Sequence, residues 1–281
     1  MGRLFLGLVL AGSLLVGTGP QQTAAGQPVV DTAAKAESNR DACGPKTRKP
    51  NGRPWRCTFV DHFKVPKLSR FWVQHPEKVP LSPGAACKKR KNVKVWNGQL
   101  QLSVNRTGKV FGCQFHVGAV TTYHTFSQKY GRFQARIRAR GTQQRGLQEA
   151  FWLWPDDRVK SKDRWPASGE IDIAETYSQH PDLAVPFLHY GSGGVQKGVN
   201  TAQDCEAKRG KWHVYTLIWG PEKIEIKVDG KRCLLNTSGD RAFKKKYIVC
   251  FTAMNGIGGN RVTSKTPLPS TMRVDWVKVW R

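Results

Sequence analysis

Three carboxylic acids lie close together in one short segment, Trp165-Pro-Ala-Ser-Gly-Glu170-Ile-Asp172-Ile-Ala-Glu175. The chain has 20 acidic residues in all, so three of them within this span form an unusual concentration. Two neighbouring carboxyl groups can cleave a glycosidic bond as nucleophile and general acid/base when they stand ~5–5.5 Å apart. Crowding also raises the pKa of at least one of them, which a general acid requires.

This acidic segment is expected to be a β-strand, because its two isoleucines are β-branched. Side chains alternate across a strand, so Glu170 and Asp172 should face the same side. Glu175 would point the opposite way unless one extra residue at Ile173-Ala174, a β-bulge, returned it to the acidic face. The alternative interpretation is an acidic strand edge that merely faces solvent.

Other segments of the chain also show the patterns of strands. Residues 133–140 alternate between apolar side chains and Arg136, Arg138 and Arg140. Lys223–Val228 alternates as well and is followed by Asp229-Gly230, a strong hairpin signal. Ten Trp, 28 Gly and 16 Pro, without a long helical period, indicate an all-β sandwich.

The motif Gly169-Glu-Ile-Asp-Ile-Ala-Glu175 resembles the active-site strand of glycoside hydrolase family 16, in the laminarinase-like branch that has the bulge. The resemblance covers roughly residues 59–280. Further matches occur in the order expected for the family, and they are Phe59-Val-Asp-His-Phe63, Tyr130-Gly-Arg-Phe-Gln-Ala-Arg136, Ala150-Phe-Trp-Leu-Trp154, His189-Tyr-Gly191, Trp212-His-Val-Tyr-Thr-Leu-Ile-Trp219, Val228-Asp-Gly230, Gly258-Gly259 and Val274-Asp-Trp-Val277.

The resemblance implies a concanavalin A-like fold, a curved β-jelly-roll sandwich of two antiparallel sheets with substrate lying across the concave face. It implies that Glu170 is the nucleophile, Glu175 the acid/base and Asp172 a supporting carboxylate. The positions that it places in the substrate cleft are Trp165, Trp152 and His189. In one departure from the family, Gly146-Leu-Gln-Glu149 precedes Ala150-Phe-Trp152 where the family usually has Trp-Pro, which puts that side of the cleft in doubt.

The resemblance therefore implies a secreted, retaining endo-β-glycosidase, a hydrolase of O-glycosyl bonds that cuts β-1,3 or β-1,3/1,4 glucan by double displacement. Three alternatives stay open: an endo-β-galactanase acting on an agarose-like or sulfated polysaccharide, a transglycosylase, and a non-catalytic polysaccharide-binding protein. No cofactor is expected for catalysis. Many family members bind a structural Ca²⁺, and Asp275 is the candidate ligand here.

The charge of the chain points to its partners rather than to its fold. With 46 Lys and Arg against 20 Asp and Glu, the formal net charge is +26. Besides a polysaccharide substrate, we expect an anionic cell-wall or matrix polymer bound through the basic surface. Arg136, Arg138 and Arg140 would bind sulfates or carboxylates if their face of the sheet is concave. A nucleic acid fits the charge alone and is not expected, and the protein is expected to be a monomer.

The N-terminal residues have the character of an export signal. An apolar run, Leu4–Val16, follows Arg3 and precedes small residues near Ala25. We predict a signal peptide at 1–25, a disordered polar linker at 26–42 and a single catalytic domain at 43–281. A membrane anchor is the alternative, but the run is shorter than the ~20 residues that span a bilayer. The mature protein should be extracellular, without membrane contact.

Seven cysteines follow the predicted signal, and in an exported protein most should form disulfides. The expected pairs are Cys43–Cys57, Cys87–Cys113 and Cys205–Cys233, although other pairings remain open. Cys250 lies in an apolar run and is expected to be the buried free thiol.

Overall fold

The structure is a computed structural model that describes residues 40–159, 163–191 and 193–281. Within these ranges the helices are single 3-10 turns, and the regular structure is otherwise β. None of these helices has the length and apolar character that crossing a bilayer requires. The predicted signal at 1–25 and most of the predicted linker at 26–42 lie outside the described residues.

The strands in the described ranges form a small sheet of the first two and one 15-stranded arrangement of the rest, which turns back on itself. They are β1 (Arg40–Asp41), β2 (Gly44–Pro45), β3 (Cys57–Asp61), β4 (Ala86–Lys88), β5 (Val93–Trp96), β6 (Gln99–Val110), β7 (Cys113–Thr121), β8 (Gly131–Arg138), β9 (Leu147–Pro155), β10 (Glu170–Tyr177), β11 (Leu183–His189), β12 (Cys205–Glu206), β13 (His213–Trp219), β14 (Ile224–Val228), β15 (Lys231–Asn236), β16 (Tyr247–Asn255) and β17 (Ser270–Trp280). The 3-10 turns are η1 (Pro83–Ala85), η2 (Arg90–Asn92), η3 (Arg241–Phe243) and η4 (Gly258–Asn260).

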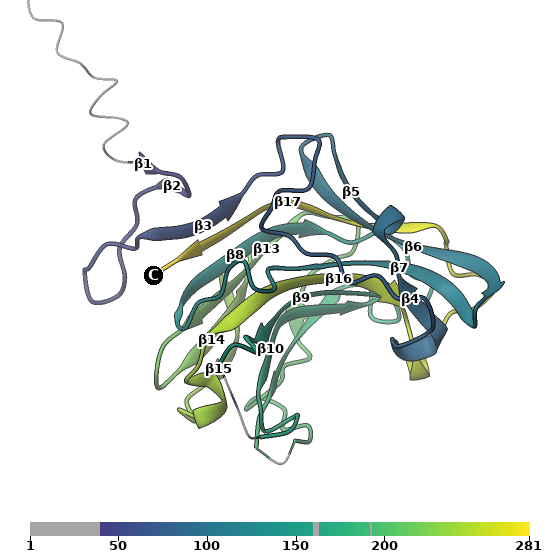
Figure 1. The fold of residues 1–281 in the computed structure, drawn as a ribbon. Coiled ribbons are helices and arrows are strands. Elements are labelled where there is room, and N and C mark those ends of the chain that lie inside the picture. Colours follow the sequence, from purple (N-terminus) through teal and green to yellow (C-terminus); the bar gives the residue numbers. More distant parts are fainter. Residues whose placement is uncertain (1–39, 160–162, 192) are drawn as a thin grey trace, which may run out of the picture. The chain divides into compact units, whose positions relative to one another are not determined.

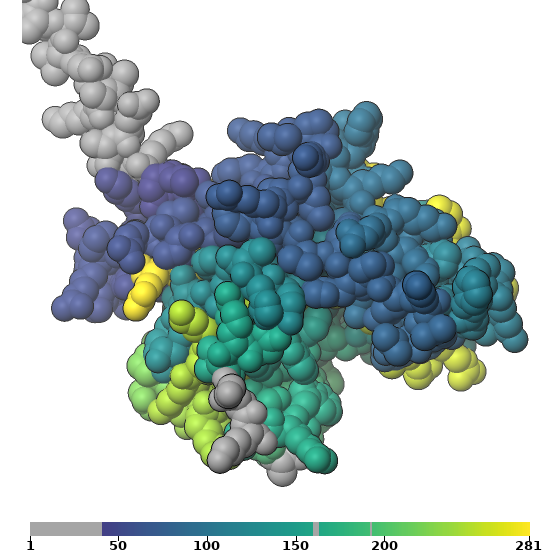
Figure 2. All heavy atoms as spheres, in the orientation of Figure 1, coloured from purple at the N-terminus to yellow at the C-terminus, as the bar shows by residue number. Residues whose placement is uncertain are grey.

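Two curved layers result from the strand order β12-β11-β10-β9-β16-β7-β6-β17-β8-β13-β14-β15 (Figure 1). The first layer contains β10, β9 and β16, and the second contains β17, β8 and β13. Neighbouring strands are antiparallel except for β4, which runs parallel to β7. The predicted all-β jelly-roll sandwich is therefore confirmed. In the space-filling view, the purple-to-blue residues 40–120 lie together along one side of this unit (Figure 2).

The core lies between the two layers, where alternate residues of each strand are buried. On β8 the predicted alternation is confirmed, since Phe133, Ala135 and Ile137 are buried and the arginines between them are not. Aromatic side chains join the layers: the rings of Trp219 from β13 and Tyr247 from β16 lie 5.3 Å apart, edge to face. Each layer thus keeps one face for the core and one outer face.

Two of the three expected disulfides are present, Cys43–Cys57 and Cys87–Cys113. The third expected pair is not a disulfide in this structure, because Cys205 and Cys233 are thiols, and they hydrogen bond to each other. Donation in this hydrogen bond raises the pKa of the Cys205 thiol, while acceptance lowers that of Cys233. Cys250 is a buried free thiol, as expected.

A buried ion pair lies on the core side of the acidic strand. Arg209 donates to both carboxylate oxygens of Glu149 on β9, at 2.7 and 2.8 Å. Thr176 of β10 donates to the same carboxylate at 2.8 Å, and the Arg209 Nε donates to the carbonyl oxygen of Arg140. Glu149 and Arg209 are 3% and 6% exposed, so both charges depend on these partners. The pair joins β9, β10 and the chain before β13.

We predict that Glu149→Gln lowers the free energy of unfolding by about 3–5 kcal/mol, because Arg209 stays buried without its carboxylate. Urea denaturation measures the change. The double variant Glu149→Leu/Arg209→Met should cost less, since no buried charge is left alone. As a control, Lys231→Gln breaks the exposed pair with Glu206 and should cost less than about 1 kcal/mol. Equal losses for the buried and exposed pairs would contradict the argument.

Candidate active site

The acidic side chains of β10 share one face because the strand has a bulge. Asp172 pairs with Trp152 of β9. Ala174, two residues later, pairs with the adjacent Phe151, so β10 has one residue more than β9 at this point. Both residues between Asp172 and Glu175 are buried in the core. The predicted bulge is confirmed, and it returns Glu175 to the side of the sheet that Asp172 occupies.

Glu170 begins the strand and is held by an indole. Trp165 Nε1 donates to Glu170 Oε2 at 2.7 Å, while the Trp165 side chain remains 53% exposed. Burial raises the pKa of Glu170 to about 7; the Trp165 hydrogen bond opposes this rise and the charge of Glu175 adds to it. The preceding Gly169 has φ +91°, and a Cβ there would collide with the Tyr247 hydroxyl. This position therefore requires glycine.

Asp172 lies deepest among the three acids and is 4% exposed. Burial raises its pKa well above the ordinary value, and Glu175 and Glu170 raise it further. Its Oδ2 lies 3.1 Å from His189 Nε2, from the neighbouring strand β11. Burial lowers the pKa of His189. Burial therefore favours the protonated acid and the neutral imidazole in this contact.

Glu175 is held by two side chains of its own face. Gln148 Nε2 donates to Glu175 Oε1 at 2.8 Å, and the Tyr177 hydroxyl also donates to this carboxylate. Burial raises the pKa of Glu175, and the two hydrogen bonds oppose the rise. Burial, and after it the nearby acids, raise the pKa of Tyr177, which therefore stays a hydroxyl donor.

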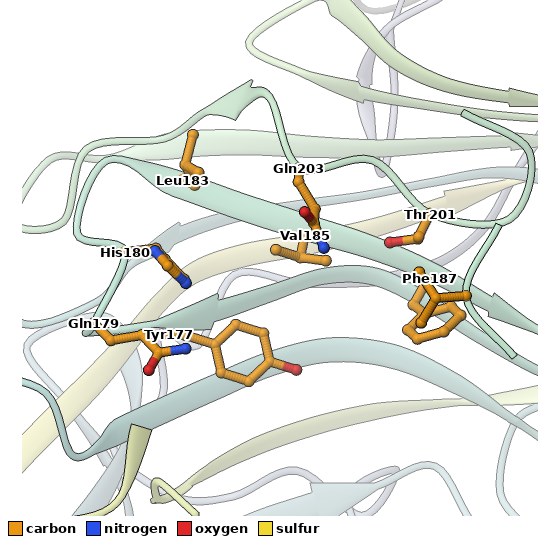
Figure 3. A pocket seen from close by; sticks show the side chains of 9 residues that line it. Tyr177, Gln179, His180, Leu183, Val185, Phe187, Thr201 and Gln203 are labelled. Atoms are coloured by element: carbon orange, nitrogen blue, oxygen red, sulfur yellow. The ribbon is translucent and has the colours of Figure 1, made fainter. Parts of the chain in front are cut away.

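A cavity of about 430 Å³ adjoins the acidic row at Tyr177. Figure 3 shows Tyr177 from β10, Val185 and Phe187 from β11, and Thr201 and Gln203 from the following segment around this space. The lining is mainly apolar with amide and hydroxyl groups, a composition that suits a sugar ring. The cavity therefore lies next to the acidic row, at the end where Tyr177 binds Glu175.

The structure brings the sequence-predicted cleft residues onto the same outer face. Trp152 lies beside Asp172 on β9, where its Nε1 donates to Thr252 Oγ1 at 3.1 Å. His189 pairs with Glu170 across the two strands, and its ring lies 5.2 Å from that of Trp165. One polar atom each of Glu170, Asp172 and His189 lie within 4.8 Å of one another. Their catalytic and binding roles stay predictions.

Asp275, the predicted Ca²⁺ ligand, lies away from this group on the outer face of the other layer. Its Oδ2 accepts from Arg136 Nη1 at 2.6 Å. Among the described residues, no cluster of three candidate ligating side chains includes Asp275. Ca²⁺ takes six to eight oxygen ligands, which can include backbone carbonyls, and the role of Asp275 as a Ca²⁺ ligand stays a prediction.

Several residues of the site were not identified from the sequence. Gln148 and Tyr177 bind Glu175, while Glu149 and Arg209 support the strand from the core side. The signal for two of them was the Gly146-Leu-Gln-Glu149 departure, which places an amide on the cleft face and a carboxylate in the core. Arg209 and Tyr177 had no local signal, because their partners lie far away in sequence or depend on the bulge.

Because folding raises the pKa of Glu170, the stability of the protein should depend on pH. The Glu170 carboxyl changes from an ordinary pKa of 4.5 to about 7 on folding, so ionisation opposes folding. The penalty is absent below pH 4.5 and complete above about pH 7. We therefore expect Glu170→Gln to melt at a higher temperature than the unchanged protein at pH 7.5, with the difference vanishing near pH 4. Calorimetry across this range measures it, with the exposed-site variant Glu206→Gln as control. A pH-independent difference would contradict the prediction.

Known proteins match this chain along most of the described residues. A family model described as "Glycosyl hydrolases family 16" matches residues 84–278. Glucan endo-1,3-beta-glucosidase A1 of Niallia circulans is 29% identical over 224 residues, 68% of this chain and 31% of that protein. Keratan-sulfate endo-1,4-beta-galactosidase of Sphingobacterium multivorum is 28% identical over 174 residues, 59% of this chain and 40% of that protein. The chain thus covers less than half of the length of these two relatives.

Solved structures share the fold. The endo-beta-1,3-glucanase from Pyrococcus furiosus superposes with a TM-score of 0.72 at 22% identity, covering 84% of this chain and 97% of the other. The laminarinase from Rhodothermus marinus gives 0.68 at 24% identity, covering 81% and 97%. At these identities the likeness concerns the fold. The family match spans more than half of the 281 residues and includes the whole acidic strand. This chain therefore belongs to glycosyl hydrolases family 16.

Proposed function

We propose that this chain is a retaining endo-β-glycosidase that hydrolyses β-1,3 or β-1,3/1,4 glucan without a cofactor. The observation that carries the proposal is the bulge in β10, which gathers Glu170, Asp172 and Glu175 on one outer face. The names of similar proteins support the substrate class, among them a beta-glucanase from Rhodothermus marinus that is 28% identical over 207 residues. A non-catalytic binding protein would have no need of these buried, energetically costly acids.

In the proposed mechanism, Glu170 attacks the anomeric carbon as the carboxylate, and the bond to the leaving oxygen breaks. The Trp165 N–H can only donate, so it favours this ionised form. Glu175, which burial keeps protonated to higher pH, gives its proton to the leaving oxygen. Glu175 then takes a proton from water, which attacks the glycosyl-enzyme ester and frees Glu170. The raised pKa of Asp172 favours its protonated form, which would limit the negative charge of the site.

The substrate would lie across the outer face of β11, β10, β9 and β16. Trp165 and Trp152 offer aromatic surface on either side of the acids, and His189 lies between Trp165 and Asp172. The cavity beside Tyr177 would receive the sugar next to Glu175. An open face of this kind suits internal cleavage of a long chain, because neither end of the substrate has to be enclosed.

A sulfated or agarose-like galactan is the second candidate substrate. Two observations favour it, the net charge of +26 and the similarity to a protein named keratan-sulfate endo-1,4-beta-galactosidase.

We also propose that the protein acts outside the cell. The export-signal pattern of residues 1–25 and the disulfides Cys43–Cys57 and Cys87–Cys113 support this location.

Release of reducing ends from laminarin, lichenan, agarose, carrageenan and keratan sulfate tests the substrate class. We expect laminarin or lichenan to be cut, and Glu170→Gln to lower the rate by at least about 10³-fold through loss of the nucleophile. The exposed-site variant Glu206→Gln should retain full activity. Cleavage of a galactan alone would replace the glucan assignment, and products longer than the starting oligosaccharide would identify a transglycosylase.

Rescue by azide tests the roles of the two glutamates. With an aryl β-glycoside, Glu170→Ala should yield the α-glycosyl azide, because azide attacks from the face that the nucleophile has vacated. Glu175→Ala should yield the β-glycosyl azide, since the glycosyl-enzyme still forms. NMR of the anomeric proton distinguishes the products. The reverse pattern would exchange the two roles.

A further inference from the structure

The outer face of the second layer, opposite the core, presents a cluster of arginines. On β8 and β17 the inward side chains Ala135, Ile137 and Val274 are buried, so the residues between them face outward. We call this surface the arginine face, and it consists of Arg136, Arg138, Arg140, Arg273 and Trp212. The proposed catalytic acids lie on the outer face of the other layer, so the two surfaces look away from each other.

Two arginines of this face stand directly opposite each other. Arg138 of β8 pairs with Arg273 of β17 across the antiparallel ladder. Lys94 of β5 continues the row on the far side of Gln101. Directly opposed like charges destabilise a sheet. In the described parts of the chain, no carboxylate forms an ion pair with Arg138 or Arg273. The fold thus maintains a cationic pair whose repulsion a bound anion would relieve.

Trp212 holds two of the guanidinium groups in place. The guanidinium carbons of Arg136 and Arg138 lie 4.6 and 5.0 Å from its ring centroid. A guanidinium that lies over an aromatic ring leaves N–H groups available for oxygen acceptors. Arg136 already uses part of its edge on Asp275, whereas Arg138 has no such partner among the described residues. Because the contact with Trp212 restricts the side chain beforehand, binding an anion costs less conformational entropy.

We propose that the arginine face binds an anionic polysaccharide through its sulfate or carboxylate groups, principally between Arg138 and Arg273. The planar fork of arginine matches such oxyanions. Single-stranded nucleic acid would need aromatic faces on which bases stack. The cations of Arg136 and Arg138 occupy the ring of Trp212 instead. The arginine face lies on a different layer from the acids, so the protein can hold an acidic matrix there while the acidic row acts on another chain.

The test measures binding of the full chain to dextran sulfate, polygalacturonate and uncharged dextran by titration calorimetry. We expect Arg138→Gln/Arg273→Gln to weaken binding of a charged polymer at least about tenfold, through loss of two charge-assisted contacts. The control Arg53→Gln/Arg56→Gln removes the same charge from exposed positions elsewhere and should change binding less than about twofold. Equal weakening by both variants would mean a general charge effect and would overturn the site.

Two further outcomes decide the proposal. The Arg138→Gln/Arg273→Gln variant should keep a melting temperature close to that of the unchanged protein at low salt, because removing the repulsive pair offsets the lost contact of Arg138 with Trp212. Lost binding then cannot reflect unfolding. The charged polymer whose affinity falls in this variant identifies the ligand group, sulfate for dextran sulfate or carboxylate for polygalacturonate. Tighter binding of a DNA duplex with the same arginine dependence would overturn the polysaccharide assignment. So would displacement of dextran sulfate by a neutral glucan oligosaccharide, because it would place the anion in the cleft.

Discussion

The bulge in β10 is the constraint on which the candidate active site depends, because a regular strand cannot place residues five apart on the same face. Without the extra residue, Glu175 would enter the core and displace apolar side chains that are now fully buried. With it, Ile173 and Ala174 both fill the core, and Glu175 stands on the outer face with Asp172. The same local distortion thus preserves the packing and assembles the acids.

Grouping three acids on a half-buried face makes this strand costly to fold. Burial raises the pKa of each acid, and the structure compensates with donors, Trp165 at Glu170 and Gln148 at Glu175. Behind the strand, the Glu149–Arg209 pair ties Thr176 to β9 and fixes the backbone next to Glu175. The raised pKa values on the outer face and the Glu149–Arg209 pair on the core side therefore concern the same strand. The hydrogen bonds and the ion pair together hold the acids in fixed positions.

A sandwich of two layers has two outer faces that the core separates. In this protein the face of the first layer carries acids and aromatic rings, and that of the second carries arginines that lie over the ring of Trp212. The arginines of this cluster consequently lie on a different layer from the acids, where a neighbouring cation would lower the pKa values that burial raises. Asp275 lies beside the arginine face, where it pairs with Arg136.

The sequence by itself determined the features that depend on local pattern: the all-β class, the alternation of residues 133–140 and the bulged acidic strand. It also indicated two disulfides, while the third expected pair, Cys205 and Cys233, proved to be hydrogen-bonded thiols. Only the tertiary structure decided which distant residues meet, such as Arg209 with Glu149 and Arg138 opposite Arg273. The physical reason is that periodicity and β-branching act between neighbours in the chain. Cross-strand register and the burial of charge are instead set by packing between segments that are far apart in the sequence.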